Sequence, residues 1–243
     1  MQLKIVNSNS SGNCYILENE MESLIIECGV RFDRIQRALN FKLRNVVGAL
    51  LSHEHGDHSK GVHELQSKGI DVYASLGTLK ALKIEHNHRS FSMVAGKSTV
   101  IGGFEVIPFE VNHDAAEPFG FLIRHKECGI TLFLTDTKYS KYRFGGLNNV
   151  IVEANYCEGI IAEKLLDKRF LKDRVIDSHL SIQTCIELLK ANDLSQVNNI
   201  VLIHLSDSNS DEARFKKNVA EVTGKTVHVA TAGMCIDFNK TPF

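Results

Sequence analysis

The sequence lacks several features that would place the protein in a specialised class. It has no tryptophan and only three prolines, and no stretch approaches the roughly 20 apolar residues that cross a bilayer. The first residues, MQLKIVNSNSSGN, contain no apolar run of the kind that a signal peptide needs. Charge of one sign is also lacking, because 28 basic and 29 acidic residues leave a formal net charge of −1. We therefore expect a cytoplasmic protein with no membrane partner, and any binding of a charged substrate must be local.

Cysteine pairs are also lacking. The six cysteines are scattered singly, with no C-x-x-C motif and no dense framework. Such spacing is typical of reduced, buried thiols rather than of disulfides or a thiolate metal site. The length of 243 residues and the hydrophobic content of 43% fit one large core, so we expect a single domain over residues 1–243.

Short β-type runs alternate with helical patterns along the chain. The stretches 3–6, 14–18 and 23–27 are separated by turn-forming residues and indicate an antiparallel opening. Residues 46–52 form a continuous apolar run, which is typical of a central strand covered on both faces. Two β-rich halves, each accompanied by helices, predict two sheets packed face to face with helices outside. The expected fold is an α/β protein with four αββα layers.

The strongest chemical signal is an H-x-H-x-D-H motif directly after the apolar run 46–52. His53 and His55 lie two residues apart, so an extended chain directs both rings to one side, where they can share a metal ion. Asp57 and His58 follow the Gly56 turn and can face a second metal. Imidazole and carboxylate suit zinc and neighbouring transition metals. A solvated histidine-rich loop is the alternative, but four ligand-type residues rarely coincide at this spacing.

Three later residues, each at the end of a strand pattern, complete the candidate site. His113 can supply a third nitrogen to the first metal, and His204 can close the second. Asp136 offers two oxygens, enough to bridge two metals about 3.5–4 Å apart. A histidine at the end of a strand is more often a surface or hydrogen-bonded residue than a ligand. These three residues are therefore candidate ligands only in combination with the first motif. The remaining histidines are not expected to be ligands, namely His63, His86, His88, His125, His179 and His228.

These residues resemble the metallo-β-lactamase superfamily over essentially the whole chain. Within it, the sequence is similar to the YycJ/WalJ group of stand-alone exonucleases, through SNSSGNCYIL, SHEHGDHSKGV, HDAAEPFGF, SHLSIQ and HLSDSN. The resemblance implies an αββα metallo-β-lactamase sandwich and two divalent ions, Zn²⁺ or Mn²⁺. It places the metal ligands at His53, His55, Asp57, His58, His113, Asp136 and His204. Lys138 and Asn9 stand where the group usually has glycine, which leaves the shape of their loops open.

The resemblance also implies a catalytic histidine and a reaction. By similarity to ribonuclease Z and related nucleases, His179 falls at the position of a proton-donating residue. The hypothesis is a metal-dependent hydrolase, a phosphodiesterase and specifically a DNA exonuclease, in which a metal-bridging hydroxide attacks phosphorus. Asp57 or Asp136 would orient the nucleophile, and His179 would protonate the leaving oxygen.

Nucleic acid is the expected partner, with DNA favoured over RNA. Basic residues could neutralise phosphates near the site, or they could form a solvated helix face. They follow Asp136 or crowd a predicted helix and its exit, at Lys138, Lys141, Arg143, Lys164, Lys168, Arg169, Lys172 and Arg174. The turn SNSSGN could also present backbone N–H groups to a phosphate, although an ordinary strand connection explains it equally well.

Three alternative functions stay open. A small-molecule hydrolase, such as a glyoxalase II-like thioesterase or a lactonase, would share the ligands but need no basic track, and HDAAEPFGF and SHLS argue against it. An RNA-processing nuclease would share the chemistry, although the stretch from Asp136 to His179 is too short for the extra domain of ribonuclease J-like enzymes. A non-catalytic binding protein is disfavoured by the complete ligand set, and His55, where flavodiiron proteins have glutamate, disfavours a redox role.

Overall fold

Two mixed β-sheets packed face to face organise the chain in the computed structural model, which describes residues 1–164 and 169–241. The first sheet contains, in spatial order, β14 (Cys235–Asp237), β1 (Gln2–Asn9), β2 (Gly12–Glu18), β3 (Ser23–Ile26), β4 (Val46–Leu50), β5 (Val72–Ser75) and β6 (Ser90–Met93). The second contains β13 (Thr226–Val229), β12 (Asn199–Ile203), β11 (Leu147–Glu153), β10 (Gly129–Leu134), β9 (Phe119–His125), β8 (Phe104–Glu110) and β7 (Thr99–Ile101).

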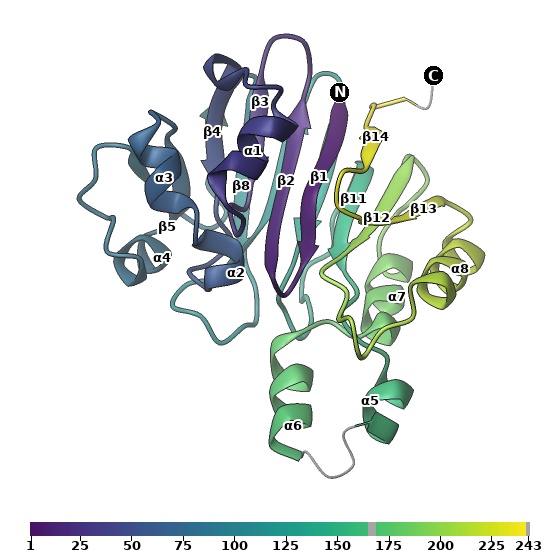
Figure 1. Ribbon diagram of the computed structural model, residues 1–243. Coiled ribbons are helices and arrows are strands. Elements are labelled where there is room, and N and C mark those ends of the chain that lie inside the picture. The colour runs from purple at the N-terminus through teal and green to yellow at the C-terminus, as the bar shows by residue number, and fades with distance from the viewer. Residues whose placement is uncertain (165–168, 242–243) are drawn as a thin grey trace.

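Helices cover the outer faces of both sheets (Figure 1). The first sheet carries α1 (Phe32–Ala38), α2 (Gly56–Ser59), α3 (Val62–Ser67) and α4 (Leu76–Ala81), with a 3-10 turn at Leu43–Asn45. The second carries α7 (Ile182–Lys190) and α8 (Glu212–Thr223). The four-layer αββα prediction is confirmed. In the part of the chain that the structure describes, no helix combines the length and the apolar character needed to cross a membrane.

Strand alternation explains how both faces of a sheet become buried. Successive residues of a strand point to opposite faces. In β2, Tyr15 and Leu17 therefore enter the core between the two sheets, while Ile16 enters the core beneath the helices of the first sheet. In β4, Leu50 faces the first of these cores and Ala49 faces the second. Burial on both faces gives the continuous apolar run that the sequence shows, and the parallel pairing of β4 with β3 and β5 confirms it as a central strand.

The strand directions bring the polar strand ends to one end of the sandwich. In the first sheet, β3, β4 and β5 run parallel, and in the second, β10, β11, β12 and β13 run parallel. His53 follows β4, Asp136 follows β10, and His204 follows β12 directly. Helices α5 (Glu158–Lys164) and α6 (Arg169–Ser178) project beyond this end, whereas both chain termini lie at the opposite end (Figure 1).

Some elements were not predicted from the sequence. Helix α6 lies where we expected the exit from the preceding helix. Half of its residues are charged, and of its described side chains Val175 and Ile176 pack against a small cluster formed by Tyr156 and Ile161. Strands β6 and β7 are four and three residues long, which is too short for a clear sequence pattern. Pairing with β5 and β8, rather than local pattern, places these two strands in the sheets.

Candidate metal centre

The H-x-H-x-D-H motif forms a bend followed by a short helix. Gly56 begins helix α2 instead of forming the expected turn, so Asp57 and His58 lie in the first turn of that helix. The backbone N–H of His58 donates to the His55 carbonyl oxygen at 2.9 Å and fixes the bend. Gly29 packs directly against the backbone of Asp57, where a side chain would collide with the carbonyl group. The segment that follows β3 therefore packs closely against the motif.

The first group of candidate ligands contains three histidines and one carboxylate. His53, His55, His113 and Asp136 each offer one ligand atom, and these atoms lie within 4.8 Å of one another. His55 Nδ1 and His113 Nε2 are 3.1 Å apart. The Nε2 atoms of His53 and His113 each lie 3.6 Å from Asp136 Oδ2. The structure therefore brings together the four residues that the sequence assigns to the first metal.

The second group of candidate ligands lies beside Asp136. Asp57, His58 and His204 also place one ligand atom each within 4.8 Å of one another. The Oδ2 atom of Asp57 lies 3.4 Å from His58 Nε2 and 3.3 Å from His204 Nε2. Asp136 Oδ2 is 3.3 Å from His58 Nε2, and its Oδ1 is 2.8 Å from His204 Nδ1. Asp136 thus faces both groups, as a bridging residue must.

The donor atoms fit divalent cations of the zinc type. The Nδ1 atom of His113 lies 3.0 Å from the Ser178 carbonyl oxygen, which only accepts, so Nε2 retains its lone pair. The buried Nε2 atoms of His53 and His204 have no hydrogen-bond partner among the described residues. Two imidazole nitrogens on one tetrahedral zinc stand about 3.3 Å apart, given zinc–nitrogen bonds of 2.0–2.1 Å. The spacing of His55 and His113 matches this value.

Electrostatics keep the two carboxylates of the cluster ionised. Burial alone would raise the pKa of Asp136, but His204 and His58 outweigh burial and hold that pKa well below its usual range. Partial burial alone would raise the pKa of Asp57, but the nearby imidazoles of His204 and His58 outweigh burial and lower that pKa. Ionised carboxylate oxygens and imidazole nitrogens together form a donor set that suits a divalent cation.

Residues behind the candidate ligands orient their rings. Ser52 Oγ lies 2.8 Å from His53 Nδ1, and Glu27 Oε2 lies 3.5 Å from His58 Nδ1. Glu27 is fully buried and accepts the Ser52 backbone N–H at 3.1 Å. Such partners set the ring orientation of a ligand and are part of a metal site. Sequence reasoning missed Glu27, although a carboxylate at the end of the apolar run SLIIE is the signal that could have shown it.

Glu153 is the most important residue that sequence reasoning missed. It ends strand β11, is fully buried, and its Oε1 lies 2.7 Å from His179 Nδ1 and 3.0 Å from His204 Nδ1. Its Oε2 accepts the Leu180 backbone N–H at 3.0 Å. Burial would lower the pKa of His179, but the nearby Glu153 and Asp136 carboxylates outweigh burial and raise it. The glutamate at the end of the apolar run VIVE is the sequence signal that could have identified Glu153 as a site residue.

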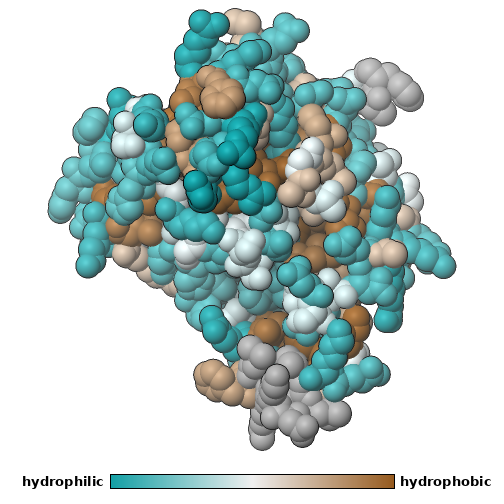
Figure 2. Space-filling view, viewed as in Figure 1, coloured by the Kyte–Doolittle hydropathy of each residue, from teal (hydrophilic) through white to brown (hydrophobic). Residues whose placement is uncertain are grey.

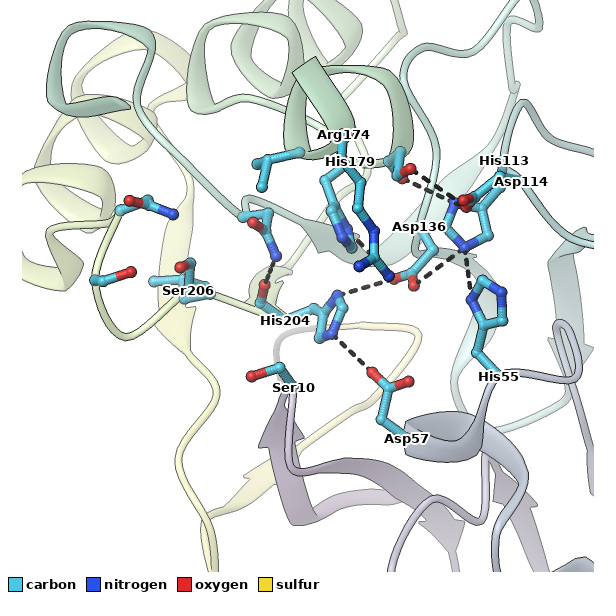
Figure 3. A pocket seen from close by; sticks show the side chains of 16 residues that line it. Ser10, His55, Asp57, His113, Asp114, Asp136, Arg174, His179, His204 and Ser206 are labelled. Carbon is cyan, nitrogen blue, oxygen red and sulfur yellow. Dashed lines mark hydrogen bonds and ion pairs between the residues drawn. The ribbon is translucent and has the colours of Figure 1, made fainter. Parts of the chain in front are cut away.

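A cavity of about 440 Å³ opens over the two ligand groups (Figure 3). Five of the seven predicted ligands line it, while His53 and His58 lie buried beneath. The lining also includes five uncharged polar residues, Ser10, Asn155, Ser206, Ser208 and Asn209, together with Leu205. Helix α6 and the residue after it contribute Arg174, Val175, Ser178 and His179. The predicted proton donor therefore borders the same space as the candidate ligands.

The predicted basic residues do not act as one group. Lys138 pairs with Asp177 at 2.6 Å, and Lys141 pairs with Glu110 at 3.2 Å. Lys164 donates to the Ser208 carbonyl oxygen. Lys168 and the side chain of Arg169 lie outside the described residues. Of the basic side chains that the structure describes, Arg174 is the one that lines the cavity.

The other predictions near the site have mixed outcomes. Ser10, in the turn between β1 and β2, lines the cavity, so that turn does border the site. His125 lies in the charged hairpin that joins β9 and β10, where its side chain is buried and stands 3.2 Å from Glu22. Of the six histidines that were not expected to be ligands, five lie outside the clusters of potential ligands in the described part of the chain, namely His63, His86, His88, His125 and His228. His179 belongs to one of these clusters, together with Asp136, Glu153 and His204.

The sequence of this chain is similar to those of known proteins. Residues 24–205 match the family described as the beta-lactamase superfamily domain. The chain is 30% identical over 224 residues to "Exodeoxyribonuclease WalJ" of Streptococcus pneumoniae, covering 85% of this chain and 82% of that protein. It is 26% identical to "Exodeoxyribonuclease YycJ" of Bacillus anthracis, covering 91% and 89%.

A solved structure agrees with these sequence matches. The metallo-beta-lactamase fold protein YhfI from Bacillus subtilis superposes with a TM-score of 0.72 at 14% identity, over 96% of this chain and 98% of that one. At this identity the likeness concerns the fold alone. The family match spans most of the chain, and the αββα layers carry the histidine and aspartate cluster where their strand ends meet. The chain therefore belongs to the metallo-β-lactamase superfamily, as the sequence resemblance predicts.

Proposed function

We propose that the protein is a two-metal phosphodiesterase that removes nucleotides from an end of DNA. The observation that carries this proposal is the position of Asp136 between two groups of histidine and carboxylate ligands, beside a polar cavity. The exodeoxyribonuclease names of the two relatives support the choice of DNA, since the alignments cover most of each protein.

The seven predicted residues would hold the cations. His53, His55 and His113 would bind the first ion, Asp57, His58 and His204 the second, and Asp136 both. Zn²⁺ and Mn²⁺ are the proposed ions, because the donors are imidazole and carboxylate without thiolate. When bound, two such cations activate water and neutralise charge on the phosphate. The chain itself supplies the geometry, through the ring contacts of Ser52, Glu27 and the Ser178 carbonyl.

His179 would act as the proton donor and Glu153 as its positioning residue. Because the Glu153 carboxylate accepts hydrogen bonds, His179 Nδ1 carries the proton between them and Nε2 is the nitrogen left for the substrate. The ring borders the cavity, within reach of a leaving group bound over Asp136. A protonated His179 can then transfer its Nε2 proton to the departing oxygen, a role worth about 10²–10⁴ in rate.

The test is a comparison of substrates with one enzyme preparation. End-labelled single- and double-stranded DNA and RNA are incubated with protein loaded with Zn²⁺ or Mn²⁺. We expect stepwise loss of nucleotides from DNA, abolished by a chelator and restored by added metal. An Asp136→Ala variant purified in parallel controls for a contaminating nuclease, because contaminant activity would survive in it. Hydrolysis of thioesters or lactones with no activity on any nucleic acid would overturn the proposal, and a preference for RNA would change the substrate.

A further inference from the structure

The N-terminal hairpin, which consists of β1, β2 and the turn between them, directs polar side chains inward. The face of the molecule in Figure 2 is largely hydrophilic, and its apolar side chains lie in separate areas. By contrast, Asn13 and Tyr15 of β2 are fully buried. Burying a polar group costs free energy unless the group finds a hydrogen-bond partner. The partners of these two side chains therefore show what the hairpin contributes.

A β-bulge in β1 turns Ser8 toward the same buried face. Ile5 lies opposite Tyr15 and Ser8 lies opposite Asn13, with a register shift between the two pairs. The chain takes three steps from Ile5 to Ser8 but only two from Tyr15 to Asn13, so β1 carries one extra residue. Because side chains alternate along a strand, this extra residue brings Ser8 to the face of Asn13 and Tyr15. Tyr15 belongs to the core between the two sheets, so all three residues face the second sheet.

A chain of hydrogen bonds joins these three residues to two candidate ligands. The His204 backbone N–H donates to Ser8 Oγ at 2.9 Å, and Ser8 Oγ lies 2.8 Å from the Tyr15 hydroxyl. The Tyr15 hydroxyl donates to Asn13 Oδ1 at 3.3 Å, and Asn13 Nδ2 donates to Asp57 Oδ2 at 3.4 Å. An ionised carboxylate only accepts, so Asn13 must present its amide nitrogen to Asp57 and its oxygen to Tyr15. Ser8 is then the donor to Tyr15, and every proton of the chain has a place.

Two glycines allow the hairpin to come this close to the metal loop. A Cβ atom on Gly12 would stand 2.1 Å from the Gly29 carbonyl oxygen, and the Gly29 N–H donates to the Asn13 carbonyl oxygen at 2.9 Å. Gly29 in turn packs against the backbone of Asp57. Asn13 Nδ2 consequently lies 3.2 Å from His58 Nε2 as well as near Asp57. The amide of Asn13 thus stands beside two ligands of the second group.

The polar groups of the turn are engaged with one another. Asn9 Oδ1 accepts the Ser11 backbone N–H at 3.0 Å and the Ser11 hydroxyl at 2.6 Å. Asn7 Nδ2 donates to the same oxygen at 3.0 Å and to the Gly12 carbonyl oxygen at 2.6 Å. Lys60, at the end of helix α2, donates to the Ser11 carbonyl oxygen at 2.6 Å. These contacts favour a rigid support for the metal loop over a backbone nest for a phosphate.

We propose that Asn13, Tyr15 and Ser8 are positioning residues for the second metal ion, an inference that rests on the two-ion site of the proposed function. Asn13 restrains the rotation of the Asp57 carboxylate. Ser8 holds the backbone of His204, whose φ of 54° lies in the left-handed region that residues with a side chain rarely adopt. Hydrogen-bond partners that orient a ligand raise the affinity of its metal. The chain ends on Asp57 and His204, so the second ion depends on it more than the first.

The test measures the affinity of each Zn²⁺ ion in competition with a chromophoric chelator. Asn13→Ala should weaken the second ion by about 10- to 100-fold, the usual effect of losing the partner of a ligand, and leave the first ion unchanged. Tyr15→Phe keeps the ring and removes the hydroxyl, so it should weaken the second ion by about 2- to 10-fold. In the double variant the loss should be smaller than the product of the two single losses, because one chain carries both effects.

Matched controls separate positioning from general stability. Asn199 begins β12, at the end of the strand away from His204, and its side chain donates to Asn149 Oδ1 at 3.0 Å. Asn199→Ala should therefore lower the free energy of unfolding and leave both Zn²⁺ affinities unchanged. Tyr73→Phe controls for the loss of a hydroxyl, since the Tyr73 ring stacks on Phe91 near the edge of the same sheet. It should also leave both affinities unchanged.

The outcomes separate this inference from the proposed function. If the unmodified protein binds fewer than two ions, the two-metal site fails and the inference fails with it. If it binds two ions and Asn13→Ala holds the second as tightly as Asn199→Ala does, only the inference is overturned. Equal weakening of both ions would also overturn it, because that result indicates a general loss of structure. If circular dichroism shows that Asn13→Ala does not fold, Tyr15→Phe decides, and a second-ion affinity equal to that of Tyr73→Phe overturns the inference.

Discussion

At the scale of single residues, the sequence predicts ligand types better than the residues that position them. The seven predicted ligands converge because each follows a strand or begins a helix at the same end of the sandwich. Glu27 and Glu153 were not predicted, because a buried carboxylate has no local sequence pattern of its own. Its role depends on neighbours that lie far along the chain, such as His58 and His179.

His179 should serve the chemistry more than metal binding. His179→Ala should keep the fold and both metals and lose about 10²–10⁴ in turnover, because a proton donor to the leaving oxygen is removed. Metal content and turnover are measured on the same preparation. His86→Ala is the matched control, since its side chain is 95% exposed beside Glu85. Near-normal turnover would exclude the acid role, and loss of metal would make His179 a ligand.

Glu153 should matter through the two histidines that it contacts. Glu153→Gln removes the negative charge that contacts His179 Nδ1 and His204 Nδ1. We expect turnover to fall about 10- to 100-fold, because losing a residue that orients a catalytic or ligand group usually has an effect of this size. Glu110→Gln, at an exposed glutamate that pairs with Lys141, should have no such effect. Steady-state rates at saturating metal make the comparison, and equal rates for the two variants would refute the positioning role.

At the scale of elements, the long buried strands were predictable and the short edge elements were not. Strand β4 is recognisable in the sequence as an apolar run, because both of its faces are buried. Helix α6 has no such signal, since half of its side chains are charged and the apolar contacts of its described side chains are few. A turn was expected at Gly56, but the start of helix α2 at this residue was not predicted. The close packing of the motif depends on Gly29, which lies in a different segment and permits close backbone contact.

Gly29 should be sensitive to the smallest added side chain. A Cβ atom there would stand 1.6 Å from the Asp57 carbonyl oxygen, so the metal loop must shift in Gly29→Ala. We expect a loss of about 1–3 kcal/mol in the free energy of unfolding, together with weaker metal binding. Gly145→Ala is the control, because no atom lies within 4 Å of its added Cβ. Urea unfolding measures both, and a midpoint for Gly29→Ala equal to that of Gly145→Ala would contradict the packing argument.

At the scale of the whole molecule, the αββα arrangement follows from the alternation of strands and helices and is confirmed. That residues 1–243 form one domain, and that the protein is cytoplasmic, stay predictions. The position of the α5–α6 hairpin beyond the ligand-bearing end could not be predicted, because it depends on tertiary contacts such as that of Lys164 with Ser208. It is this arrangement that places Arg174 and His179 over the candidate metal centre.

The count of metal ions per chain tests the central claim most directly. The protein is purified without chelator, resupplied with Zn²⁺ or Mn²⁺, freed of excess metal, and analysed for metal and protein in the same sample. Asp136 belongs to the first group and also contacts His58 and His204 of the second, so we predict two ions per chain. Asp57→Ala should lose the second ion first, while Asp33→Ala, at a residue that pairs with Arg37 on helix α1, should keep both. One ion or none in the unmodified protein would contradict the two-metal site and the chemistry proposed for it.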